Sequence, residues 1–365
     1  MRDFSEAPFL VIWEVTQACD LACRHCRASA QPERHPAELT RAEAEELIRQ
    51  IREFGDPLLV FTGGDPLKRE DLFDLLRMSV AAGLRTTITP SATPLLTGEA
   101  VRRFRDAGVA RMAVSLDGAD APQHDGFRGV EGSFRITLEA LRAAREAGLE
   151  TQINTTVTRR NFRSLDRIAA LVEDSGARLW SVFFLVVTGR AQLEDDLTAE
   201  EYEQVFEFLY RISLTAPFDV KTTEAQHYRR FAARQRKASG AAPARASAGA
   251  IARQAGINDG KGLLFISHTG EIYPSGFLEI SAGNVRNVRL ADAYRNSRLF
   301  RVLRNADALG GKCGVCEYRN LCGGSRARAW ALTGDFLAAD PRCSYLPPAF
   351  AEPASPMQSR SAPPA

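Results

Sequence analysis

The sequence has no hydrophobic run long enough to cross a membrane. A transmembrane helix needs about 20 consecutive apolar residues, and no stretch of the 365 residues approaches that length. The opening residues, MRDFSEAPFLVIWEV, also lack the basic segment followed by a cleavable apolar segment that marks a secretory signal. We therefore expect a cytoplasmic protein with no membrane partner.

A strong excess of charge of either sign is missing as well. Lys and Arg number 47 and Asp and Glu number 45, which gives a formal net charge of +2, and the two signs are mixed along the chain. Nucleic-acid binding depends on clustered positive charge that neutralises phosphates. A nucleic-acid partner is therefore not expected.

Cysteine is absent from most of the chain. The seven cysteines fall into two short groups, three near the N-terminus and four between Cys313 and Cys343. In a reducing compartment, cysteines grouped in this way are more often metal ligands or catalytic groups than disulfides. Two metal sites are the simplest interpretation.

Strand-like and helix-like segments alternate over the first two thirds of the chain. Apolar segments rich in β-branched residues are each followed by a helical pattern, which predicts parallel strands with right-handed crossovers. Capping boxes predict helix starts at Thr40 with Glu43 and at Thr198 with Glu201. The expected strands lie at 9–16, 57–64, 84–90, 109–118, 149–158 and 178–187. Six units are fewer than the eight of a closed TIM barrel, so we expect an α/β fold built on an open, partial (β/α)6 TIM-like barrel.

Composition divides the chain into four parts. An Ala-, Arg- and Ser-rich stretch predicts a flexible linker at 229–260. The Pro- and Ser-rich end predicts a disordered tail at 347–365. The partial barrel is then expected at 1–228, and a small C-terminal domain with short strands and the second cysteine group at 261–346.

Cys19, Cys23 and Cys26 place three thiolates in one short loop after the first expected strand. Iron–sulfur clusters that only transfer electrons normally have four cysteine ligands, so one iron is left for another molecule. This CxxxCxxC loop resembles the signature of the radical S-adenosylmethionine (SAM) superfamily. The resemblance implies a 4Fe-4S cluster whose fourth iron is chelated by SAM, and reductive cleavage of SAM to methionine and a 5′-deoxyadenosyl radical.

Zinc is the alternative for this loop. Cysteine and histidine at short spacing also suit zinc, with His25 or His35 as the fourth ligand. The spacing favours the cluster. Members of the family carry a bulky ring at the position of His25, so we expect this residue to pack or to act behind the ligands.

The turn after the second expected strand resembles the family's GGE/DP motif. It reads Gly63, Gly64, Asp65 and Pro66. The resemblance implies that its carbonyls and carboxylate receive the SAM amino group, and missing side chains at the glycines would allow close approach. The alternative is an ordinary turn between a strand and a helix, since Gly, Asp and Pro are common turn residues.

Further SAM contacts are expected at the ends of the fourth and fifth strands. The run from Ser115 to Gly118 and the later Arg128-Gly129 resemble the SLDG…RG pattern of the same family. The resemblance implies that Ser115 and Asp117 contact ribose or the amino group, and that Arg128 pairs with the SAM carboxylate. A turn and a surface arginine are the alternative. Asn154 and Thr156 are additional candidates.

The C-terminal group supplies four thiolates, a full shell for one cluster or one zinc. With the upstream loop, it resembles the SPASM extension, which implies an auxiliary 4Fe-4S cluster and hence two clusters in the chain. Two-cluster SPASM proteins carry further cysteines where this chain has Ser275 and either Ser325 or Arg326, so their first auxiliary cluster is expected to be absent. The cluster ligands are Cys313, Cys316, Cys322 and Cys343.

The strings GEIYPSGF, SAGNVR and CGVCEYRNLCGGSRARA are most similar to the haem-biosynthesis, coproheme decarboxylase-like subgroup, and next to peptide maturases. The resemblance implies a tetrapyrrole or peptide substrate and an electron donor such as flavodoxin or ferredoxin. A non-catalytic zinc or iron–sulfur scaffold is the alternative from another class.

The segment after the last expected helix contains cations that could meet substrate carboxylates. The alternative is a solvated amphipathic helix. No residue is assigned as a general acid or base, and no catalytic residue is expected beyond the cluster ligands. The candidate substrate contacts are His227, Tyr228, Arg229 and Arg230.

Overall fold

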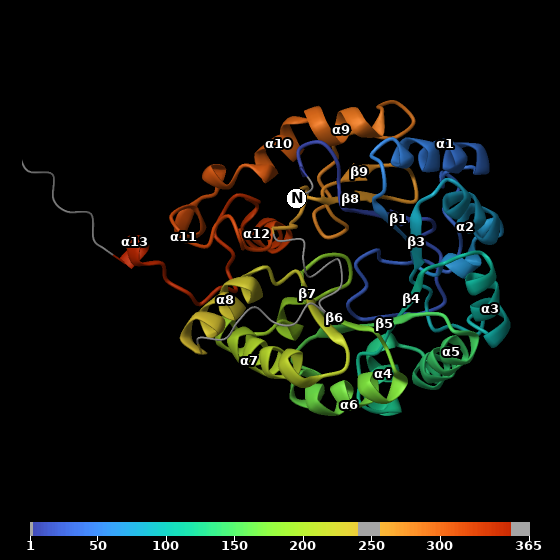
Figure 1. Ribbon diagram of the computed structural model, residues 1–365, viewed down its shortest axis with the longest axis horizontal. Coiled ribbons are helices and arrows are strands. Elements are labelled where there is room, and N and C mark those ends of the chain that lie inside the picture. Colours follow the sequence, from blue (N-terminus) through green and yellow to red (C-terminus); the bar gives the residue numbers. More distant parts are fainter. Residues whose placement is uncertain (1–2, 240–255, 352–365) are drawn as a thin grey trace, which may run out of the picture.

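A curled nine-stranded sheet forms the centre of the structure, a computed structural model that describes residues 3–239 and 256–351. The strand order is β7-β6-β5-β4-β3-β2-β1-β8-β9, and every neighbouring pair is parallel except β8 with β9. Figure 1 shows the strands of the sheet following one another along a curve. The strands are β1 Leu10–Glu14, β2 Leu58–Thr62, β3 Arg85–Ile88, β4 Arg111–Ser115, β5 Thr151–Val157, β6 Leu179–Phe184, β7 Asp219–Thr223, β8 Leu263–Ile266 and β9 Ile272–Tyr273.

Helices cover the outer face of this sheet, following one another around it (Figure 1). Both expected capping boxes are confirmed, at Thr40 with Glu43 and at Thr198 with Glu201. The two faces of the sheet differ in polarity, because successive side chains of a strand point to opposite faces. In β5, Ile153 and Val157 are buried, whereas Asn154 lines the cavity on the inner face. The helices are α1 Arg41–Arg52, α2 Leu72–Ala81, α3 Gly98–Asp106, α4 Ala121–Arg128, α5 Ser133–Ala147, α6 Leu165–Ser175 and α7 Ala199–Thr215.

The open, partial barrel is confirmed, and its sheet contains three strands beyond the six expected. Strand β7 was not predicted, because its sequence, DVKTT, has a single apolar residue, Val220. Strand β8, expected in the C-terminal domain, pairs in parallel with β1, with Leu263 opposite Leu10. The sheet therefore continues into the C-terminal part of the chain.

Beyond the strands, the chain from α8 onward consists of helices and loops. Residues 229–239, expected in a flexible linker, form most of α8, and 240–255 lie outside the described residues. Of the expected disordered tail, 348–351 form α13, and 352–365 lie outside the described residues. The helices are α8 His227–Ser239, α9 Leu290–Asn296, α10 Arg298–Arg304, α11 Gly311–Gly314, α12 Arg326–Thr333 and α13 Pro348–Ala351.

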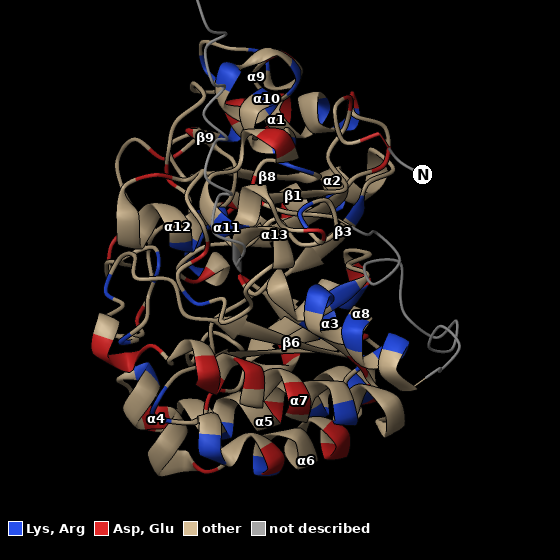
Figure 2. Cartoon of the chain, turned by 90° about the vertical axis from the view of Figure 1, so that its left-hand side faces the viewer, with Lys and Arg blue, Asp and Glu red and all other residues tan. Residues whose placement is uncertain are grey.

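Acidic and basic residues are mixed on several outer helices, whereas α8 carries only basic ones. Figure 2 shows acidic and basic residues interspersed over α4, α5, α6 and α7. Within the part of the chain that the structure describes, every helix is too short or too polar to span a bilayer.

Candidate active site

The three N-terminal cysteines lie in the loop that follows β1, at the carboxyl end of the barrel strands. Cys19 and Cys23 are buried and Cys26 packs against them. Backbone N–H groups donate to the sulfurs of Cys19 and Cys26, each at 3.4 Å. Burial raises the pKa of the Cys19 thiol to about 11. Such a thiol becomes a thiolate at neutral pH only beside a cation, and iron in a cluster provides that charge.

Contacts from other elements fix the conformation of this loop. Arg190, after β6, donates from Nε to the carbonyl of Cys23 at 3.0 Å. His25 stacks on Phe127 with ring centroids 4.3 Å apart and an interplanar angle of 5°. The expectation that His25 packs is thus confirmed. The contact between Arg190 and the cysteine loop was not predicted, because the only signal in the sequence is the position of Arg190 after a strand.

Each histidine of the zinc alternative lies against another ring, and Nδ1 of His25 is buried without a hydrogen-bond partner among the described residues. The ring of His35 lies edge-on to His268, with centroids 5.5 Å apart. Over residues 3–239 and 256–351, no three side chains of His, Cys, Asp and Glu are grouped closely enough to bind one metal ion. Sulfurs that share a tetrahedral zinc lie about 3.8 Å apart, whereas a cluster distributes its thiolates over separate irons. The donor set therefore suits a cluster.

The turn after β2 presses directly against the cysteine loop. The amide of Gly64 donates to Thr16 at 2.8 Å and the amide of Asp65 donates to Ala18 at 2.6 Å. A Cβ on Gly64 would lie 2.6 Å from the carbonyl oxygen of Gln17 and closer still to that of Ala18. Only glycine fits at this position.

We expect Gly64→Ala to destabilise the protein by about 1–3 kcal/mol, because the methyl group would force two backbone segments apart. The amount of iron bound at the adjacent cysteine loop should decrease together with the stability. The matched control is Gly126→Ala in α4, where a Cβ meets no atom within 4 Å. That variant should gain up to about 1 kcal/mol from helix propensity. Thermal unfolding and iron analysis test both, and equal behaviour of the two variants would contradict the prediction.

Asp65 contacts groups of the loops around it. Its carboxylate is fully buried and accepts from Thr93 Oγ1 at 2.7 Å and from the amide of Leu67 at 3.2 Å. Burial raises its pKa to about 6. Asp65 therefore joins the loops after β2 and β3, and Thr93 is a partner that the sequence motif does not reveal. Contact of Gly63, Gly64, Asp65 and Pro66 with SAM stays a prediction.

Asp117 and Arg128 form an ion pair with each other. Both side chains are nearly or fully buried, and Arg128 also approaches the sulfur of Cys23 at 3.5 Å. The amide of Thr156 donates to Asp117 at 2.6 Å. The pair links the turn after β4 to the cysteine loop, so Arg128 is not a free guanidinium. Its pairing with the SAM carboxylate, and the expected contacts of Ser115, Asn154 and Thr156, stay predictions.

A cavity of about 770 Å³ occupies the inside of the curled sheet. This volume is in the range of ligand pockets, which span about 300–1,000 Å³. Inward-facing residues of the strands, including Asn154 and Ser181, form its wall, and Arg27 of the cysteine loop reaches it. The cavity therefore adjoins the cysteine loop.

Glu224 lies at the edge of this cavity, directly after β7, and has an unusual backbone. Its φ is +56°, a left-handed conformation that costs a non-glycine residue energy and often marks functional sites. The buried carboxylate accepts from Ser325 Oγ at 2.5 Å. Burial, with the neighbouring Asp259, raises its pKa to about 8. The sequence alone did not reveal this acid.

We expect the free energy of unfolding of Glu224→Gln to exceed that of the wild type by an amount that grows as the pH rises. The unfolded state loses its proton near the ordinary value, whereas the folded state keeps it up to about pH 8. The folded state thus binds more protons, so wild-type stability falls between about pH 5 and 8 and the loss levels off above that. Urea unfolding at several pH values measures the difference. Glu207→Gln, at an exposed position of α7, is the control, and identical pH profiles of all three proteins would contradict the raised pKa.

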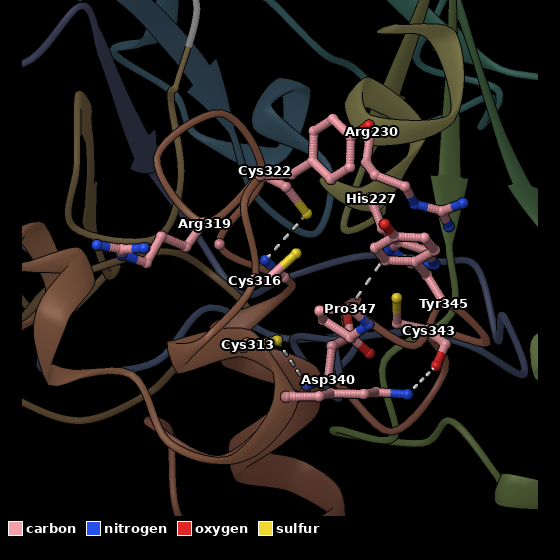
Figure 3. Close-up of a pocket in the computed structure, with 14 residues that line it drawn as sticks. His227, Arg230, Cys313, Cys316, Arg319, Cys322, Asp340, Cys343, Tyr345 and Pro347 are labelled. Atoms are coloured by element: carbon pink, nitrogen blue, oxygen red, sulfur yellow. Dashed lines mark hydrogen bonds and ion pairs between the residues drawn. The ribbon is translucent and has the colours of Figure 1, made fainter. Parts of the chain in front are cut away.

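The four C-terminal cysteines surround a second pocket, as Figure 3 shows. Amide groups donate to Cys322 from Gly324 at 3.3 Å and to Cys313 from Asp340 at 3.5 Å. Burial raises the pKa of the Cys322 thiol to about 12. All four C-terminal cysteines are partly buried. Thiols with N–H donors in such a site fit an iron–sulfur cluster that supplies positive charge.

The candidate substrate contacts in α8 separate into different environments. His227 and Arg230 line the cysteine pocket (Figure 3). Tyr228 packs near Phe206, with ring centroids 5.5 Å apart. Of the four, only Arg229 lines the barrel cavity. The reason is the helix itself, because successive residues point about 100° apart. Contact of these residues with a substrate stays a prediction.

The residues that replace cysteines of two-cluster SPASM proteins are engaged within the protein. Ser275 Oγ accepts from the amide of Phe277 at 3.3 Å. Ser325 donates to Glu224, and Arg326 donates to three backbone carbonyls. The absence of a further cluster at this place stays a prediction.

Comparison with known proteins places the chain in a family. The family described as "Radical SAM superfamily" matches residues 13–172. AdoMet-dependent heme synthase of Oleidesulfovibrio alaskensis is 44% identical over 349 residues, covering 95% of this chain and 90% of that protein. AdoMet-dependent heme synthase of Methanosarcina barkeri is 40% identical over 347 residues, covering 95% and 99%.

Two solved structures share the fold. Streptococcus suis SuiB has a TM-score of 0.72 at 18% identity, covering 93% of this chain and 78% of that one. Native anSMEcpe with bound AdoMet has a TM-score of 0.67 at 14% identity, covering 92% and 93%. With the sequence relatives matching nearly end to end, this chain belongs to the radical SAM superfamily and is an enzyme that uses a 4Fe-4S cluster and SAM.

Proposed function

We propose that this enzyme oxidatively decarboxylates propionate side chains of an iron-bound tetrapyrrole. The observation that carries the proposal is the connection of three sites. The barrel cavity touches the N-terminal cysteine loop through Arg27, and it touches the C-terminal cysteine segment through Glu224 and Ser325. The reaction starts with formation of a radical and ends with removal of an electron. It therefore needs a substrate cavity between a site that forms the radical and a site that accepts the electron. The names of the two heme synthase relatives support the same substrate class.

We assign the N-terminal loop to the SAM-binding cluster and the C-terminal group to an auxiliary cluster. Asn154, which lines the cavity, and the carbonyls of Gly63 and Gly64 are the proposed SAM contacts on this side. The proposed ligands are Cys19, Cys23 and Cys26 for the first cluster, and Cys313, Cys316, Cys322 and Cys343 for the second.

A cluster held by Cys19, Cys23 and Cys26 would supply the electron that cleaves SAM. A hydrogen atom then leaves the propionate carbon next to the ring for the 5′-deoxyadenosyl radical. The substrate radical, CH•–CH2–COO⁻, breaks its bond to the carboxylate and gives a vinyl group, carbon dioxide and one electron. The protein positions the propionate and keeps water from the radical. Flavodoxin or ferredoxin is the proposed source of reducing electrons.

The test is an anaerobic reaction of the reconstituted enzyme with SAM, dithionite and iron coproporphyrin III. We expect 5′-deoxyadenosine, and porphyrin products that have each lost one carbon dioxide and two hydrogens per reacted side chain. Cleavage of SAM with an unchanged porphyrin would refute this substrate. In that case the peptide-maturase alternative becomes the next hypothesis.

A further inference from the structure

Lys221 lies in the cavity wall, in one row with Asn154. The strand register places Lys221 of β7 opposite Ser181 of β6, and Ser181 opposite Asn154 of β5. All three residues line the cavity. Neighbouring strands are about 4.8 Å apart, so the backbones of Lys221 and Asn154 are separated by about 10 Å across the wall.

The ammonium of Lys221 has no hydrogen-bond or ion-pair partner among the residues that the structure describes. Two other cations that line the cavity, Arg27 and Arg111, differ. Arg27 pairs with Glu14, and Arg111 pairs with Glu150 at 2.9 Å. A cation that lines a cavity and has no hydrogen-bonded or ion-paired acid is suited to bind an anion.

Arg229 adds positive charge at the same corner. Its guanidinium donates to the backbone carbonyls of Ile257 at 2.6 Å and Leu321 at 3.4 Å, and both acceptors are neutral. Burial and the nearby Arg229 lower the pKa of Lys221 to about 8, so the ammonium form still dominates at neutral pH. Glu224 is an acid near Lys221, and its raised pKa keeps it largely protonated there. Asp259 lines the same cavity, and its carboxylate accepts from the amides of Arg326 and Ala327, each at 3.1 Å. Lys221 and Arg229 supply the positive charge of this corner.

We propose that Lys221 binds a substrate carboxylate in the barrel cavity, with Arg229 as the second positive charge of the site. The inference deepens the proposed function and rests on it. It places a propionate across the wall from Asn154, on whose side SAM is expected. No motif marks Lys221, because its strand, β7, is too polar to be recognised in the sequence.

The experiment is an anaerobic absorbance titration of the reconstituted enzyme with iron coproporphyrin III and with its tetramethyl ester. The variants are Lys221→Gln, Lys221→Arg and the control Lys237→Gln, which removes a charge from an exposed position of α8. We expect Lys221→Gln to bind the acid about tenfold more weakly or worse, since a charge-assisted hydrogen bond is lost. Its affinity for the ester should match that of the wild type.

Further outcomes separate the two hypotheses. Lys221→Arg should recover much of the affinity for the acid, and Lys237→Gln should bind as the wild type does. Wild-type affinity of Lys221→Gln for the acid would overturn the inference and leave the proposed function standing. Equal losses for acid and ester would also overturn it, because they would indicate a change of shape. If the wild type binds neither compound, the proposed function fails and the inference fails with it.

Discussion

Replacing Cys23 with alanine is expected to abolish reductive cleavage of SAM. Its thiol is buried in the loop after β1, within 3.5 Å of the Arg128 guanidinium. Two remaining thiols cannot hold three corners of the cluster, so the iron to which SAM binds is lost. We expect 5′-deoxyadenosine to fall to background in a dithionite assay. Iron should fall from about eight to about four per chain, because each cluster contains four irons.

The control for this experiment is Arg24→Ala. Arg24 lies between the same cysteines, but its side chain is exposed. This variant should retain iron and SAM cleavage close to wild-type levels. SAM cleavage by Cys23→Ala at the wild-type rate would show that the loop does not hold the catalytic cluster.

Features that depend on neighbouring residues in the chain could be predicted. The capping boxes at Thr40 and Thr198 need only a spacing of three residues. The apolar strands of the barrel can be recognised from their composition, and the cysteine groups can be recognised from their spacing. Strand β7 could not be recognised in this way, because a polar strand forms there only through its pairing with β6.

Features that depend on contacts between distant segments could not be predicted. The buried carboxylate of Glu224 acquires its environment from Asp259 and Ser325, which are remote in sequence. Asp65 belongs to a recognisable motif, yet its partner Thr93 comes from another loop. In both cases the residue type was visible, but its role follows from a neighbour that only the fold supplies.

The second large effect is expected at the other end of the cavity, for Cys316→Ala. The auxiliary site lies apart from the N-terminal loop, with its four cysteines around their own pocket. The variant should therefore still cleave SAM to 5′-deoxyadenosine. The proposed decarboxylation would release one electron, and without an acceptor near Glu224 and Ser325 the substrate radical would not complete the reaction. We expect vinyl products to fall to background.

Val315→Ala is the matched control, because Val315 precedes Cys316 and its side chain is 46% exposed. It should form products as the wild type does. The ratio of vinyl product to 5′-deoxyadenosine, measured in the same reaction, is the decisive quantity. A falling ratio with intact SAM cleavage indicates electron transfer through the C-terminal site, whereas parallel loss of both indicates a folding defect. Full product formation by Cys316→Ala would show that the substrate electron leaves by another route.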